Sequence, residues 1–254
     1  AAELAEQVIA ENERDPLANM TLAVRAIKGE EYRQALERLD KILLTGIQRI
    51  VVPLMRAWAL AGDGRTDAAL ALLDNLTSTN GLGPITGLHA GMIADLSGRP
   101  DAAEAAFKRG VAASGDSAAL QLVEAYAGLL VRTNQHEKAV RLVEAFTLSH
   151  PRTLLIDPTR AALAEGKVPA PVVSTFGEGA AEALHAVANL LNRERLRAQA
   201  LVMIQMSLHL RAESPPTLYL LGQVFEREEQ TEAAMKAYSG IDPATPYGWY
   251  ARLN

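Results

Sequence analysis

The chain has 254 residues, 49% of them hydrophobic and 22% charged, which is typical of a globular protein long enough to bury a large core. Its formal net charge of −5 argues against nucleic acid as the main partner, because phosphate binding needs a concentrated basic surface. The absence of cysteine excludes disulfides, zinc–thiolate sites and thiol nucleophiles, and no apolar run approaches the roughly 18 to 20 residues of a transmembrane helix.

Helices are predicted from the first residues onward, and essentially no sheet is expected, because Ala and Leu dominate and β-branched runs are few. Residues 1–12 read as the second helix of a hairpin whose first helix is missing. At the other end, residues 246–254 open a hairpin that does not close. Because helical repeat arrays normally carry polar capping repeats, we expect the sequence to be a fragment of a longer chain.

A turn motif recurs between these ends. Each occurrence reads as a turn, a polar pair, an acid or amide, and then an alanine, and the occurrences lie at 30–35, 64–69, 98–103 and 134–139. The closing alanines are separated by 34, 34 and 36 residues, and a later pair, Ala200 and Ala234, by 34 again. A period of this length indicates a repeat architecture.

Each turn is flanked on both sides by apolar residues at helical spacing, which predicts a helix–turn–helix unit. Around the first turn these residues include Leu22 and Ile27 before it and Leu36 and Leu39 after it. Small residues occupy one position of each first helix, where they are expected to face the alanines that open the second helices. These small residues are Ala23, Ala57, Gly91, Ala127, Ala188 and Gly222.

One segment, residues 154–177, fits no repeat. It is predicted to form an extra helix at about 155–165 and then a proline-rich connector over 168–175. The predicted organisation is therefore a partial hairpin plus about four hairpins over 1–153, this segment, and about two hairpins plus the start of another over 178–254.

The repeat resembles the tetratricopeptide repeat (TPR), whose loose pattern combines a small residue, a turn, an alanine, an aromatic residue and a closing proline. The best match runs through Gly222, Phe225, Ala234, Tyr238 and Pro243. The resemblance implies an all-α solenoid, a right-handed superhelix of antiparallel hairpins that binds a partner in its concave groove. The run also resembles large TPR proteins of proteobacteria, which often begin with an export signal, and this favours the bacterial periplasm over the cytoplasm.

Catalytic, cofactor and metal sites are not predicted. The histidines include no pair three or four residues apart and no His-Glu-x-x-His run, and the chain has no Gly-x-Gly-x-x-Gly, Walker or Gly-x-Ser-x-Gly motif. Glu226, Glu228 and Glu229 lie near a turn and are expected to be solvated. Arg193, Arg195 and Arg197 are also expected in a turn, and a docking patch for an acidic partner is the alternative there.

The first helices are predicted to present one stripe of residues to the concave groove. In the early hairpins the stripe is apolar, and its residues are Leu17, Met20, Val24, Leu54, Trp58, Leu88 and Met92. In the later hairpins it is polar, and its residues are Glu124, Arg132, His185, Asn189, Arg193, Gln223 and Arg227. The apolar part is either ordinary core or a groove that takes an amphipathic helix, an extended apolar peptide or a lipid-like molecule.

The sequence thus predicts a non-catalytic scaffold that binds a protein or peptide partner. Two alternatives stay open. One is a carrier of a hydrophobic small molecule, and the other is an accessory repeat domain of a longer multidomain protein.

Overall fold

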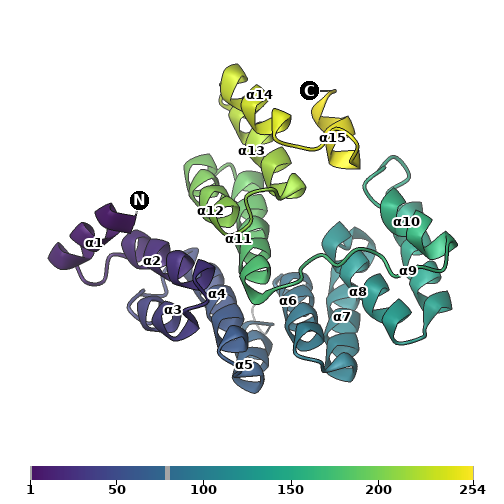
Figure 1. The fold of residues 1–254 in the computed structure, drawn as a ribbon, viewed down its shortest axis with the longest axis horizontal. Helices are drawn as coiled ribbons and strands as arrows, with labels where there is room; N and C mark the ends of the chain where they lie inside the picture. Colours follow the sequence, from purple (N-terminus) through teal and green to yellow (C-terminus); the bar gives the residue numbers. More distant parts are fainter. Residues whose placement is uncertain (1, 78–80, 254) are drawn as a thin grey trace. The chain divides into compact units, whose positions relative to one another are not determined.

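The computed structural model describes residues 2–77 and 81–253, except for the side chain of Asp116. Within these ranges the protein is all-α, with fifteen α-helices, one short 3₁₀ turn and no strand (Figure 1). The predicted all-α fold class is therefore confirmed. None of the described helices combines the length and the apolar character needed to cross a membrane.

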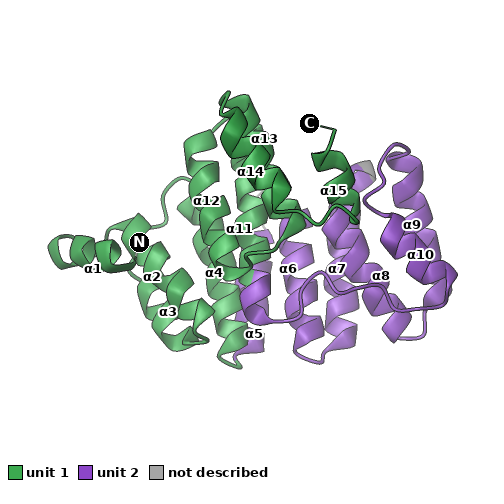
Figure 2. Cartoon of the chain, turned by 45° about the horizontal axis from the view of Figure 1, so that its top comes forward, with its two compact units in different colours: residues 1–64, 180–254 green, residues 65–179 purple. Residues whose placement is uncertain are grey.

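The chain divides into two compact units, shown in green and purple in Figure 2. Unit 1 comprises residues 1–64 and 180–254, and unit 2 comprises residues 65–179. The boundaries between these units differ from the predicted division at 154–177. The predicted division follows the repeat pattern along the chain, and it stays a prediction.

The helices of unit 1 come from both ends of the chain. They are α1 (Ala2–Glu11), α2 (Pro16–Lys28), α3 (Tyr32–Leu39), α4 (Gln48–Gly62), most of α11 (Phe176–Arg193), α12 (Arg197–Leu210), α13 (Pro215–Arg227), α14 (Thr231–Ser239) and α15 (Pro246–Ala251). The pairs α2 with α3 and α13 with α14 pack as hairpins. The first two helices also share a small core in which Ala5 packs with Ala18 and Leu22.

The helices of unit 2 are continuous in sequence. They are α5 (Thr66–Thr77), α6 (Gly83–Leu96), α7 (Pro100–Ser114), α8 (Leu120–Arg132), α9 (His136–Ser149) and α10 (Asp157–Ala164), with the 3₁₀ turn at Gly115–Ser117. The pairs α6 with α7 and α8 with α9 are hairpins. The short helix α10 falls within the predicted 155–165, and the residues of 168–175 form no helix.

Each turn between the two helices of a hairpin contains one residue with a left-handed backbone. Four of these residues have a side chain, and their φ angles lie between 58° and 62°: Glu30, Asn134, Arg195 and Glu229. In two further turns the residue is glycine, Gly64 and Gly98. The same geometry therefore recurs at the repeat period and ends each first helix in a tight reversal.

The small residues of the first helices are all buried. The alanines that open the second helices are also buried, from Ala35 at 0% exposed to Ala234 at 3%. At the glycine positions, however, the closest partner is an aromatic ring four residues beyond the alanine. A Cβ on Gly91 would overlap the ring of Phe107, and one on Gly222 would overlap the ring of Tyr238.

One packing within unit 1 joins hairpins that are far apart in sequence. Helix α12 packs against α2, and the Lys28 ammonium group donates a hydrogen bond of 2.8 Å to the carbonyl oxygen of Leu210, the last residue of α12. A cation at this end of a helix is favourable, because the last carbonyls lack helical partners and carry the negative end of the dipole. This contact positions the groove described next.

Candidate interaction grooves

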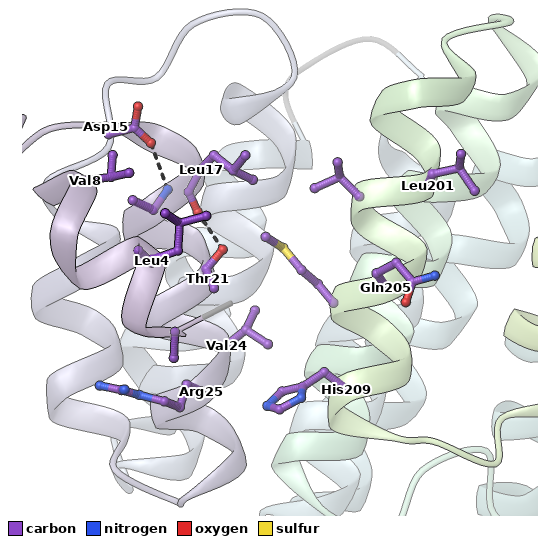
Figure 3. A pocket seen from close by; sticks show the side chains of 15 residues that line it. Leu4, Val8, Asp15, Leu17, Thr21, Val24, Arg25, Leu201, Gln205 and His209 are labelled. Atoms are coloured by element: carbon purple, nitrogen blue, oxygen red, sulfur yellow. Dashed lines mark hydrogen bonds between the residues drawn. The ribbon is translucent and has the colours of Figure 1, made fainter.

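Unit 1 contains an open groove between α1, α2 and α12, which we call the α2–α12 groove. Its volume is about 610 Å³. It is lined by Ala2, Leu4, Ala5, Val8, Asp15, Leu17, Ala18, Thr21, Val24, Arg25, Leu201, Val202, Gln205, Met206 and His209. Figure 3 shows Leu17, Val24 and Arg25 on the α2 wall and Leu201, Gln205 and His209 on the α12 wall.

Most polar groups on the α2 side of this groove are already engaged. Asp15 is the N-cap of α2 and accepts a hydrogen bond of 2.8 Å from the Ala18 amide. The Thr21 hydroxyl donates to the Leu17 carbonyl at 2.8 Å, and Figure 3 shows this hydrogen bond and that of Asp15 as dashed lines. Arg25 forms an ion pair of 2.8 Å with Glu6. The α2 wall therefore presents an essentially apolar surface, whereas Gln205 and His209 on the α12 wall remain exposed.

A second groove lies in unit 2, on the faces of α6 and α8, and we call it the α6–α8 groove. It brings together three residues of the predicted stripe, Met92, Glu124 and Arg132. Residues of the proline-rich connector lie against the same helices, so that the unfilled space measures only about 20 Å³. This groove is therefore filled by the chain's own residues.

The charged groups of the α6–α8 groove have partners on neighbouring helices. Arg132 of α8 forms an ion pair with Asp95 of α6. The Glu124 carboxylate accepts a hydrogen bond of 3.3 Å from the Thr159 hydroxyl of α10. Burial raises the pKa of Glu124 to about 7, and the Thr159 hydrogen bond opposes this shift only in part.

A buried polar network connects α11, α12 and α13 of unit 1 around His185. The Asn189 amide donates to Nε2 of the imidazole at 3.2 Å, so Nδ1 carries the proton and donates to the Thr217 hydroxyl, also at 3.2 Å. Thr217 lies 2.9 Å from the Ser214 hydroxyl, and the Ser207 hydroxyl donates to the Ala181 carbonyl at 2.8 Å. Burial lowers the pKa of His185 to about 4, which keeps the ring neutral.

The Thr217 hydroxyl, the His185 imidazole and the Asn189 amide are connected in the same sequence as the nucleophile, the base and the orienting group of a catalytic triad. Here, however, Thr217 is 1% exposed and His185 is 3% exposed. A substrate from solvent does not reach the hydroxyl in this arrangement, so we assign the network a structural role. The described residues also include no group of three or more His, Asp or Glu side chains placed to hold a metal ion.

The remaining predicted stripe residues divide into buried and accessible ones. Six of the seven apolar residues are at most 5% exposed: Met20, Val24, Leu54, Trp58, Leu88 and Met92. Leu17, the seventh, is 53% exposed and lines the α2–α12 groove together with Val24. Among the polar residues, Arg132, Arg193 and Arg227 are exposed, and Asn189 and Gln223 are half-buried. The structure thus distributes the stripe over several environments, and its role in partner binding stays a prediction.

Sequence reasoning missed the α12 wall of the α2–α12 groove. Leu201, Gln205 and His209 lie on the second helix of a hairpin, whereas the predicted stripe is confined to first helices. No local signal in the sequence could have placed α12 beside α2, because this packing joins hairpins that are far apart along the chain.

Comparison with known proteins finds no matching family model and no matching curated protein. Among solved structures, the chain is similar to YrrB, described as a TPR protein with an unusual peptide-binding site, at 17% identity over 100% of both chains and a TM-score of 0.29. It is also similar to MamA from Desulfovibrio magneticus RS-1, at 14% identity over 84% of this chain and 92% of that one, with a TM-score of 0.30. A third similar structure, the TPR domain of P58(IPK), is 14% identical over 98% of this chain and 66% of its own, with a TM-score of 0.32.

Proposed function

We propose that this chain, an all-α array of TPR-type hairpins, is a non-catalytic scaffold whose α2–α12 groove binds an amphipathic helix of a partner protein. The single observation that carries the proposal is the open groove of about 610 Å³ in unit 1, with its apolar α2 wall. Stacked hairpin arrays bury their helices between neighbours, so an open slot between three helices is suited to a further helix.

The spacing of the groove residues supports a helical occupant. Leu17, Thr21 and Val24 recur at intervals of four and three along α2, and Leu201 and Gln205 are four residues apart on α12. Such rows form ridges that pack between the side chains of another helix. The row on α2 covers about two turns, or roughly 10 Å, so the occupant would contribute apolar residues at positions i, i+3 or i+4, and i+7.

The polar groups of the α12 wall restrict the occupant further. Gln205 can donate and accept hydrogen bonds, and His209 lies on the same wall (Figure 3). An amphipathic helix meets this condition, since its apolar stripe can face α2 while a polar flank faces α12.

The proposal can be tested by selecting binders from a displayed library of helical peptides against the purified chain. Leu17→Asp and Leu201→Asp place a charge in the groove without disturbing a tightly packed core, because Leu17 is exposed and Leu201 is half-buried. We expect both variants to weaken binding of the selected peptides at least tenfold, since a buried charge without a partner is costly. The matched control is Leu148→Asp on α9, where the leucine is 82% exposed.

Peptides that bind Leu17→Asp and Leu201→Asp as tightly as they bind the wild type would refute the groove assignment. Native mass spectrometry before and after organic extraction provides an independent check. Extra mass that extraction removes would favour a carrier of a hydrophobic molecule, because the groove volume also lies in the range of ligand pockets, roughly 300 to 1,000 Å³. The polar residues of the predicted stripe stay a separate hypothesis for partner binding.

A further inference from the structure

The proline-rich connector of unit 2 is neither helix nor strand. Gly166, with φ of 68°, ends α10 in a left-handed turn, and Pro169 and Pro171 prevent a helix from continuing. Residues 168–173 form no helix or strand. We call residues 168–175 the strap.

One side of the strap is buried and the other is exposed. Pro169 is buried and Val173 is only 6% exposed, whereas Val168 is 48% exposed and Pro171 is also exposed. A segment with only two buried residues, 169 and 173, among exposed and half-buried ones lies on the surface and is not enclosed by the core. Figure 2 shows the stretch between α10 and α11 crossing the helices of unit 2.

The surface beneath the strap is the α6–α8 groove. Pro171, Val172 and Val173 border the same small cavity as residues of both helices. The α6 side contributes Met92, Asp95 and Leu96, and the α8 side contributes Glu124, Ala125, Gly128 and Arg132. A remaining space of about 20 Å³ is at the limit for a single water molecule, so strap and helices fit closely.

The strap is tethered at both ends by local structure. At its start, the Lys167 amide donates to the Ala162 carbonyl at 2.8 Å and closes the turn after α10. At its end, the Thr175 hydroxyl accepts from the Glu178 amide at 3.1 Å, and the Glu178 carboxylate accepts from the Ser174 amide at 2.7 Å. This reciprocal arrangement resembles a capping box and starts α11. These tethers belong to the turns that flank the strap and do not involve the residues that border the groove.

We propose that the strap is a displaceable internal occupant of the α6–α8 groove, and that this groove binds an extended, proline-containing apolar segment of a partner protein in exchange for it. The chemistry of the occupant follows from the strap itself, because the strap residues that border the groove are Pro171, Val172 and Val173. Because a tethered segment has a high effective concentration, the strap would exclude weak ligands and admit only segments that bind better. The inference concerns unit 2 and is independent of the α2–α12 groove.

Thiol labelling tests this proposal cleanly, because the 254 residues contain no cysteine. Val173→Cys places one thiol on the buried side of the strap, and Val168→Cys places the matched control on its exposed side. We expect Val168→Cys to react with a maleimide at the rate of a free thiol. Val173→Cys should react at least tenfold more slowly than Val168→Cys. Its labelling rate should still be at least a hundredfold higher than the rate that global unfolding in the same buffer permits, because local opening of the strap exposes the thiol.

The second step uses a synthetic peptide of residues 167–175 as the probe. Added at millimolar concentration, it should compete for the groove and accelerate labelling of Val173→Cys at least threefold. The same peptide with aspartate in place of Val173 should have no effect. Labelling of Val173→Cys that tracks global unfolding, or that the peptide does not accelerate, would show that the strap is a fixed part of the core and would overturn the proposal.

A substitution that releases the strap gives a check that does not depend on the thiol. Val173→Asp should raise the affinity of the protein for a labelled form of the 167–175 peptide at least tenfold over wild type. Val168→Asp should leave this affinity unchanged. Should Val173→Asp lose helicity by circular dichroism, Val173→Ala replaces it, with a smaller gain of about threefold. Equal affinity of all variants would contradict the competition that the proposal requires.

Discussion

Left-handed residues with side chains are a source of strain in the hairpin turns. The left-handed conformation costs a residue with a Cβ roughly 1 to 2 kcal/mol, whereas glycine adopts it without this cost. The chain nevertheless has Glu30 and Glu229 at such positions, with φ of 59° in both cases, where the equivalent turns have Gly64 and Gly98. The repeat therefore requires the turn geometry more strictly than it requires glycine.

Glu30→Gly is consequently expected to stabilise the protein. Relief of the left-handed strain exceeds the entropy that a glycine adds to the unfolded chain, so the gain should be about 0.5 to 1 kcal/mol. The neighbouring Glu31 has φ of −85°, and Glu31→Gly should instead destabilise by a similar amount. The free energy of unfolding from urea titrations measures both, and a loss of stability in Glu30→Gly would contradict the strain argument.

Close approach of helices explains a second set of glycines. A Cβ on Gly91 would overlap the Phe107 ring, while a Cβ on Gly128 would meet only the guanidinium end of Arg132, at 3.3 Å. We expect Gly91→Ala to destabilise by about 1 to 3 kcal/mol through overpacking. Gly128→Ala should be neutral or stabilising, because alanine is the better helix former and the arginine end can move. Equal melting temperatures of the two variants would refute this distinction.

The helices themselves were predictable because the signals for them are local. The apolar periodicity around each turn, together with the recurring alanine at the start of each second helix, indicates the hairpins. The proline pair at 169 and 171 likewise indicates a connector between helices. What lies beside each element was less predictable, because the contact of α12 with α2 depends on packing between distant parts of the chain.

The apolar stripe illustrates a further limit of sequence reasoning. Trp58 and Leu54 are both 0% exposed, whereas Leu17 is 53% exposed. A groove wall and a core face have the same helical spacing of apolar residues, so periodicity alone does not distinguish them. The sequence is compatible with both interpretations, and burial in the structure separates Leu17 from the other apolar residues of the stripe.

The packing of α8, α10 and the strap makes stability depend on the ionisation of Glu124. Its pKa of about 7 in the folded protein is above the ordinary value of 4.5. Between these two pH values the folded protein therefore retains a proton that the unfolded chain has lost. The resulting stability is fully present below pH 4.5 and is lost as the pH rises through 7.

Glu124→Gln mimics the neutral acid and can still accept the hydrogen bond from Thr159. We expect it to raise the free energy of unfolding at pH 8 by about 1 to 3 kcal/mol and to change it little at pH 4.5. The exposed Glu144→Gln on α9 is the control for removing a charge. An equal effect of Glu124→Gln at both pH values would mean that the carboxyl is not held neutral by its surroundings.

Over the whole molecule, buried histidines act in the opposite direction. Burial lowers the pKa of His89 in unit 2 to about 3 and that of His185 in unit 1 to about 4, from an ordinary value of 6.5. Below pH 6.5 the unfolded chain therefore binds protons that the folded chain does not, and each histidine lowers stability by roughly 1.4 kcal/mol per pH unit. Between pH 4.5 and 6.5 two such contributions outweigh the single opposite one of Glu124.

The free energy of unfolding should therefore be greatest near pH 6.5 to 7, with a loss of roughly 1.4 kcal/mol per pH unit on the acid side. Urea unfolding at pH 5, 6.5 and 8 measures the profile. His89→Leu removes one of the two histidine contributions, so its stability should change little between pH 5 and 6.5, whatever its stability at pH 6.5. If His89→Leu retained the full acid loss, protonation of His89 would not contribute to it, and the ring would have to be accessible to protons in the folded state.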